Sequence, residues 1–125
     1  MSAAATEGPE APLIPQPKNA PEDLRAAIAQ VAPESLPTFD AERAEALRQA
    51  RSTGSAAPMQ RLVGQWAVYV AIERHPQRAA RLRRLESAAE QADTDEEALA
   101  AVSEIGRILD LAFAEAGLDR GPADR

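Results

Sequence analysis

The side chains best equipped for binding form a run of arginines in the middle of the chain. Arg74, Arg78 and Arg81 share one face at helical spacing, and Arg84 continues the run. Guanidinium groups hold carboxylates and phosphates with paired hydrogen bonds. The run is therefore a solvated helix face balanced by acidic residues, a docking surface for an acidic protein, or a nucleic-acid contact. The net charge of −6 and the single lysine argue against nucleic acid.

Residues suited to catalysis are scarce. His75 is the only histidine, and its position before Pro76 predicts a helix cap rather than an acid or base. There is no cysteine, no zinc-binding HExxH, no glycine-rich phosphate loop and no GxSxG nucleophile motif. We therefore expect no enzyme, no cofactor and no small-molecule substrate.

An acidic run, Asp93–Glu97, is the one candidate for a metal site. Thr94 followed by Glu97 matches a capping box, in which both side chains satisfy backbone donors at the start of a helix. Its acidic residues also suit the positive end of the helix dipole. We therefore predict a capping role and no bound metal.

Composition indicates a helical protein with a thin core. Alanine supplies 29 of the 125 residues, whereas Leu, Ile, Val and Phe together supply 23. Alanine favours helices but buries little surface, so a partner or a second copy could complete the fold. The absence of cysteine, of a signal-peptide pattern and of a membrane-length apolar run predicts a cytoplasmic protein.

The apolar pattern and the prolines divide the chain into five expected helices between flexible ends. The expected helices cover residues 21–32, 38–52, 55–74, 76–92 and 95–116, after a flexible Pro/Ala-rich leader at 1–20 and before a flexible tail at 118–125. The third is apolar on two sides and should be central. We predict an all-α fold, an irregular antiparallel bundle of four to five helices, with one helical domain at 21–117 and disordered N- and C-terminal tails.

Three apolar residues fall where the helical pattern predicts solvent. Val68 and Ile72 project from the far side of the third helix, and Leu111 faces the polar half of the fifth. They are either core residues of helices packed on two sides, or part of a surface for a dimer or a protein partner.

The stretch from Leu36 to Pro76 carries a recognisable order of residues. It includes Phe39, Glu42, Pro58 and Trp66, and it ends in a basic residue and proline at 74–76. This order resembles a group of short actinobacterial proteins forming a domain of unknown function. The resemblance implies a compact all-α chain acting as an antitoxin-like or adaptor-like partner of other proteins, with no catalytic residue.

Two functional hypotheses follow. The first is a non-enzymatic interaction module that binds a protein partner or a second copy; the second is a small dimeric DNA-contacting regulator that uses the arginine-rich fourth helix. The predicted partner-binding residues are Val68, Ile72, Arg74, Arg78, Arg81, Arg84 and Leu111.

Overall fold

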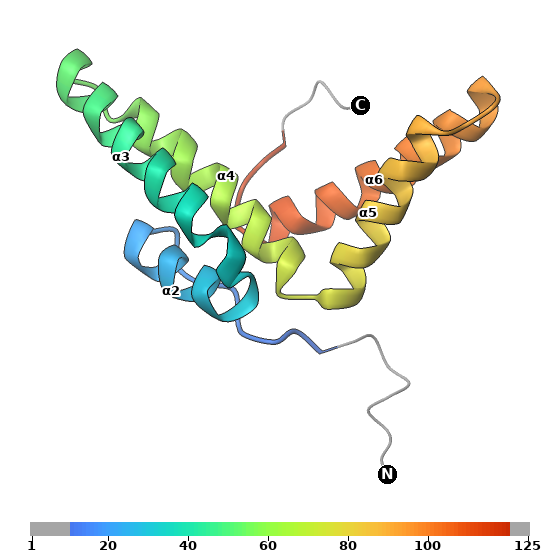
Figure 1. The fold of residues 1–125 in the computed structure, drawn as a ribbon, viewed down its shortest axis with the longest axis horizontal. Helices are drawn as coiled ribbons and strands as arrows, with labels where there is room; N and C mark the ends of the chain where they lie inside the picture. Colours follow the sequence, from blue (N-terminus) through green and yellow to red (C-terminus); the bar gives the residue numbers. More distant parts are fainter. Residues whose placement is uncertain (1–10, 121–125) are drawn as a thin grey trace, which may run out of the picture.

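A computed structural model describes residues 11–120 of the chain (Figure 1), and within that range every regular element is helical. This confirms the all-α fold. The elements in chain order are α2 (Pro21–Val31), a 3₁₀ turn η1 (Pro33–Ser35), α3 (Leu36–Thr53), α4 (Ala57–Glu73), α5 (Pro76–Glu90) and α6 (Asp95–Glu115).

Helix α4 is the centre of the molecule. It contacts α2, α3, α5 and α6, as the predicted two-sided apolar pattern requires. The helices form two antiparallel hairpins, α3 with α4 and α5 with α6, which diverge from the end of α4 like the arms of a V (Figure 1). The far halves of the arms therefore lie apart.

The interior is built from alanines around one aromatic group. Half of the buried apolar residues in the described part of the chain are alanines, which let the helix axes come close but add little apolar surface. Trp66 provides a large aromatic side chain at the centre of this group. Its ring makes edge contacts with Phe39 and Tyr69, at centroid distances of 5.3 and 5.0 Å. Its indole N–H donates to Glu42 Oε1 at 2.9 Å, which fixes α3 on α4.

Prolines and glycines set the helix ends. Every helix from α2 to α5 has proline in its first two positions, where its missing N–H is not needed. Gly54 and Gly117 follow α3 and α6 with φ of 69° and 74°, the left-handed conformation that glycine adopts without strain. One boundary differs from expectation: η1 leads directly into α3, so that helix begins at Leu36 rather than after Thr38.

Residues 11–20, the described part of the leader predicted at 1–20, are hydrogen-bonded to the helical part of the chain. The Leu13 N–H donates to the Arg74 carbonyl at 2.8 Å, the Gln16 amide to Ala67 at 3.0 Å, and the Asn19 amide to Ala116 at 3.0 Å. Prolines interrupt helical hydrogen bonding in this segment, and one backbone N–H and two side-chain amides donate instead to carbonyls of the helical part of the chain. Residues 1–10 lie outside the described range.

Residues 118–120, the described part of the tail predicted at 118–125, also make hydrogen bonds to α6. These residues turn back along α6 (Figure 1): the Leu118 N–H donates to Phe113, and the Arg120 guanidinium donates to the Gly106 carbonyl at 3.0 Å. Residues 121–125 lie outside the described range.

The capping box at the start of α6 is confirmed with one change of partner. The Glu97 N–H donates to the Thr94 hydroxyl at 3.1 Å, and the Glu97 carboxylate accepts from the N–H of Asp93, at 3.0 Å, rather than from that of Thr94. Thr94→Ala should lower the free energy of unfolding by about 1 kcal/mol, because one N–H of the first turn loses its acceptor. Urea unfolding followed by circular dichroism measures this. Thr94→Ser retains the hydroxyl and should behave like the natural chain, so an equal loss in both variants would contradict the capping role.

Candidate partner interface

Helix α6 has two apolar faces. Ala101, Ile108 and Ala112 are buried on one face. A second line runs Leu99, Val102, Gly106, Leu109 and Phe113, at alternating steps of three and four residues. Residues at this spacing form the contact line between two packed helices. We call this line of five residues the α6 seam.

The α6 seam is covered at one end and open at the other. Leu109 and Phe113 pack against the core, and the Arg120 guanidinium lies 6.0 Å from the centre of the Phe113 ring. Leu99 and Val102 lie further along, where 66% and 52% of their surface is exposed. The chain thus covers the half of the seam nearest α4 and leaves the outer half bare.

Acidic side chains border the open end of the seam. Asp95 and Glu96 are exposed, and neither makes an ion pair within residues 11–120. Asp110, further along the same side of α6, holds the Arg120 guanidinium at 2.7 Å. The exposed apolar residues therefore lie beside uncompensated negative charge.

The predicted arginine face is divided by the structure. Arg74 and Arg78 are turned inward to the Glu115 carboxylate, with N–O distances of 2.7 and 2.9 Å. Arg74 also donates to the Ile14 carbonyl at 3.1 Å, and Arg78 to Ala71 at 3.0 Å. These two arginines join the N-terminal segment, the end of α4 and the end of α6.

The same cluster changes the chemistry of Glu115. Its pKa falls from the ordinary 4.5 to about 2, first because Arg78 donates to it and then because Arg74 does, against an opposing effect of burial. A carboxylate with this pKa is charged near neutral pH and is a weak base. The cluster is built to hold elements together.

His75 occupies the N-cap position of α5, but its side chain makes no capping hydrogen bond. Instead the ring is buried, with Nε2 3.6 Å from Glu115 Oε1. The predicted cap is therefore corrected: the position is right, and the imidazole packs into the Glu115 cluster because a carboxylate lies on its inner side.

The remaining arginines of the run are at the surface. Arg81 pairs with Glu104 across the α5–α6 hairpin, and Arg83 pairs with Glu73 at 3.2 Å. Arg84 is exposed. Because the two inner arginines are engaged by Glu115, no observation favours the DNA-contacting alternative.

The three apolar residues for which the helical pattern predicts solvent exposure differ in burial. Val68 and Ile72 are 9% and 7% exposed and belong to the core, whereas Leu111 is 54% exposed. Two apolar hollows lie along α4. Val68 and Ile72 line one of them, and Val68 lines the other together with Phe113 and Leu118. Burial gives Val68 and Ile72 a structural role, and their partner-binding role stays a prediction.

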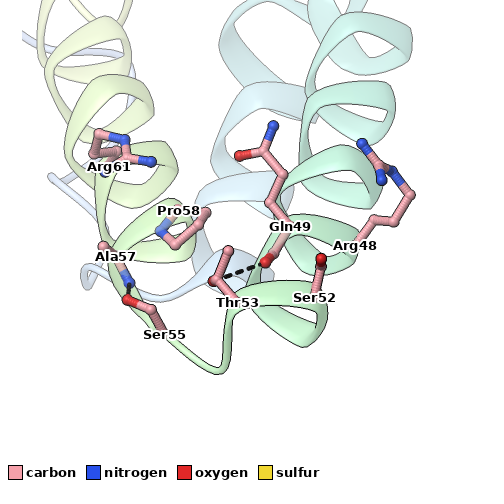
Figure 2. Close-up of a pocket in the computed structure, with 8 residues that line it drawn as sticks. All are labelled: Arg48, Gln49, Ser52, Thr53, Ser55, Ala57, Pro58 and Arg61. Carbon is pink, nitrogen blue, oxygen red and sulfur yellow. Dashed lines mark hydrogen bonds between the residues drawn. The ribbon is translucent and has the colours of Figure 1, made fainter.

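A more polar hollow lies between the end of α3 and the start of α4 (Figure 2). Figure 2 shows Arg48 and Arg61 at its edges and two hydroxyls already used by the chain: Thr53 donates to the Gln49 carbonyl at 2.9 Å, and Ser55 accepts from the Ala57 N–H at 3.1 Å. Arg48 also pairs with Glu45. The hollow offers positive charge but no nucleophile paired with a base.

Comparison with known proteins places this arrangement in a family. Residues 12–108 match DUF6247, a family of unknown function. The chain belongs to the DUF6247 family. The match includes the stretch from Leu36 to Pro76 on which the sequence resemblance was based. No curated protein and no solved structure matches the chain.

Residues 11–120 of this DUF6247 protein offer neither a metal-binding cluster nor a membrane-spanning helix. No group of three or more histidine, cysteine, aspartate or glutamate residues there could hold a metal ion. No helix in that part of the chain has the length and apolar character needed to cross a membrane.

The sequence reasoning missed the α6 seam, although a signal was present. At helical spacing, Leu99 and Val102 fall on the same apolar half of the last helix as Ile105, Ile108 and Leu109. An apolar surface half a helix wide exceeds what one neighbouring helix covers. The excess width was the sign that part of this face would remain open.

Proposed function

We propose that this DUF6247 chain is a non-enzymatic interaction module of the cytoplasm, adaptor-like or antitoxin-like, that holds a protein partner against its helices. One observation carries the proposal: Leu99 and Val102 are exposed side by side on a hairpin arm that extends away from the core. Single exposed apolar residues are ordinary, but two neighbouring ones at helix-packing spacing, in line with Leu109 and Phe113, favour an interaction surface.

The energetics of the α5–α6 arm support this function. Ala79 is the one fully buried residue of α5, and Leu82 and Leu85 are half-buried, so α5 covers only a narrow strip of α6. Most helical stability comes from packing an apolar face. A partner that covers the open seam would supply apolar burial that the arm lacks alone.

The distribution of charged side chains supports a binding role over catalysis. Arg74, Arg78 and Glu115 are committed to one another, and Arg81 to Glu104. Of the partner-binding residues predicted from sequence, Leu111, Arg81 and Arg84 are accessible to a partner, and the others support the arms from inside.

The experiment is isolation of the complex from the chain's own host. A tagged chain should retain one protein in fixed stoichiometry, and that protein, purified separately, should re-form the complex. Leu99→Ser with Val102→Ser should weaken it at least tenfold, whereas the two substitutions alone leave the fold intact because both side chains are exposed. A chain that stays monomeric in host extract, and re-forms a complex with no host protein, would refute the proposal.

A further inference from the structure

We propose that the open half of the α6 seam is a docking site for a basic amphipathic α-helix of another protein. This inference rests on the proposed function and adds the chemistry of the partner. It is argued from the spacing of the seam, from the charges beside it and from the way the chain covers the other half.

The spacing indicates a helix as the occupant. Steps of three and four residues keep the seam of α6 aligned with a second helix packed at a shallow angle. An extended strand would need unpaired backbone groups on α6, but a helix satisfies its own. The small Gly106 lies in the middle of the seam, beside Val102.

The charges indicate that the occupant is basic. Asp95, Glu96 and Glu97 are three negative charges in the first turn of α6, whereas a helix N-terminus supplies about half a positive charge. Glu97 is used in the capping box, but Asp95 and Glu96 lie exposed beside Leu99. Lysine or arginine side chains on the flanks of a docked helix would form ion pairs with these two carboxylates.

The covered half of the seam displays the same chemistry within the chain. Arg120 lies over the Phe113 ring and donates to both the Gly106 carbonyl and the Asp110 carboxylate. A basic side chain therefore already spans apolar surface and reaches an acidic residue on this face. Within residues 11–120 this cover does not reach Val102, which is 52% exposed.

A second copy of the chain fits the open half poorly. An antiparallel pair of α6 seams would bring Glu96 of one copy near Asp110 of the other, and a parallel pair would bring the two Asp95 side chains together. The outer face of α5 is basic, but within residues 11–120 the exposed large apolar residues are confined to Leu13, Leu111 and the seam. No basic face in the described chain also carries an apolar line.

The test uses two fluorescent peptides of three heptads with Leu and Ile on the seam positions. One carries lysine and the other glutamate at the flanking positions, and fluorescence anisotropy measures binding to the full chain. We expect the lysine peptide to bind at least tenfold more tightly, and its affinity to fall as salt rises from 50 to 500 mM. Leu99→Ser with Val102→Ser should weaken it at least tenfold.

Leu13→Ser is the matched control, because Leu13 is similarly exposed, at 58%, but lies in the segment before α2 and not on α6. It should leave peptide binding unchanged. Absence of binding by the lysine peptide, equal binding of both peptides, or an equal loss in the Leu13 variant would overturn the inference. So would sedimentation showing a dimer that the seam variant dissociates. A lysine peptide that fails to bind, together with a host complex that the seam variant weakens, would overturn this inference while leaving the proposed function standing.

Discussion

Glu115→Gln should lower the free energy of unfolding by about 3 kcal/mol, because it leaves two largely buried guanidinium groups without their counter-charge. Arg74 and Arg78 have 10% and 15% of their side-chain surface exposed, and both donate to this one carboxylate. Urea unfolding at pH 7 measures the loss. Glu104→Gln is the matched control: it removes an exposed partner of Arg81 and should cost less than about 1 kcal/mol.

The effect of Glu115 should also depend on pH with a defined sign. Its pKa is about 2 in the folded chain against 4.5 ordinarily, so the folded state favours the charged carboxylate. The stabilisation is complete above pH 4.5 and is lost progressively as the pH falls toward 2. The difference in free energy of unfolding between the natural chain and Glu115→Gln should therefore become smaller as the pH falls from 6 to 2.5. A difference that does not change with pH would contradict the role given to this cluster. So would a loss of stability in Glu115→Gln no larger than that in Glu104→Gln.

Trp66→Ala should be the most damaging single substitution, with a loss of about 4 kcal/mol. The ring is 5% exposed, contacts Phe39 and Tyr69 edge-on, and holds Glu42 through its N–H. Its removal leaves a cavity among alanines, which cannot fill it. Thermal or urea unfolding followed by circular dichroism measures the loss, since Trp66 is the only tryptophan and fluorescence disappears with it.

Trp66→Phe provides the graded comparison. It keeps an aromatic ring but loses the hydrogen bond to Glu42, so the loss should be less than half of that for alanine. If the alanine variant does not fold, the phenylalanine variant still tests the argument. Equal stability of the natural chain and both variants would show that α3 is not held on α4 through this ring.

The fold was largely predictable because its signals are local. Prolines at helix starts, the capping box and Gly117 gave the ends of α5 and α6 within a few residues, and the two-sided apolar pattern identified α4 as central. The start of α3 was missed because a 3₁₀ turn and a helix look alike in sequence. The segment 11–20 was missed because its bonds go to distant backbone carbonyls, which no local pattern reveals.

The candidate site was less predictable, because exposure is a property of packing. Arg74 and Arg84 look equivalent in the sequence, yet one is buried against Glu115 and the other is exposed. Likewise Ile108 and Val102 belong to the same apolar half of α6, and the packing of α6 against α4 and α5 decides which of them is covered. The local excess of acidic residues was visible from the sequence, but which of them were neutralised by arginines was not.

Helix α4 belongs to one of the two diverging hairpins and packs against the other, and this arrangement has a consequence for motion. Opening the outer turns of α5 and α6 breaks few large apolar contacts, whereas opening α4 disrupts every other helix. Amide protons should therefore exchange with solvent fastest toward residues 88–99 and slowest in α4, as in a structure that opens in separate cooperative units. The arm that carries the bare seam is thus also the part of the molecule that can melt and re-form while the rest keeps its shape.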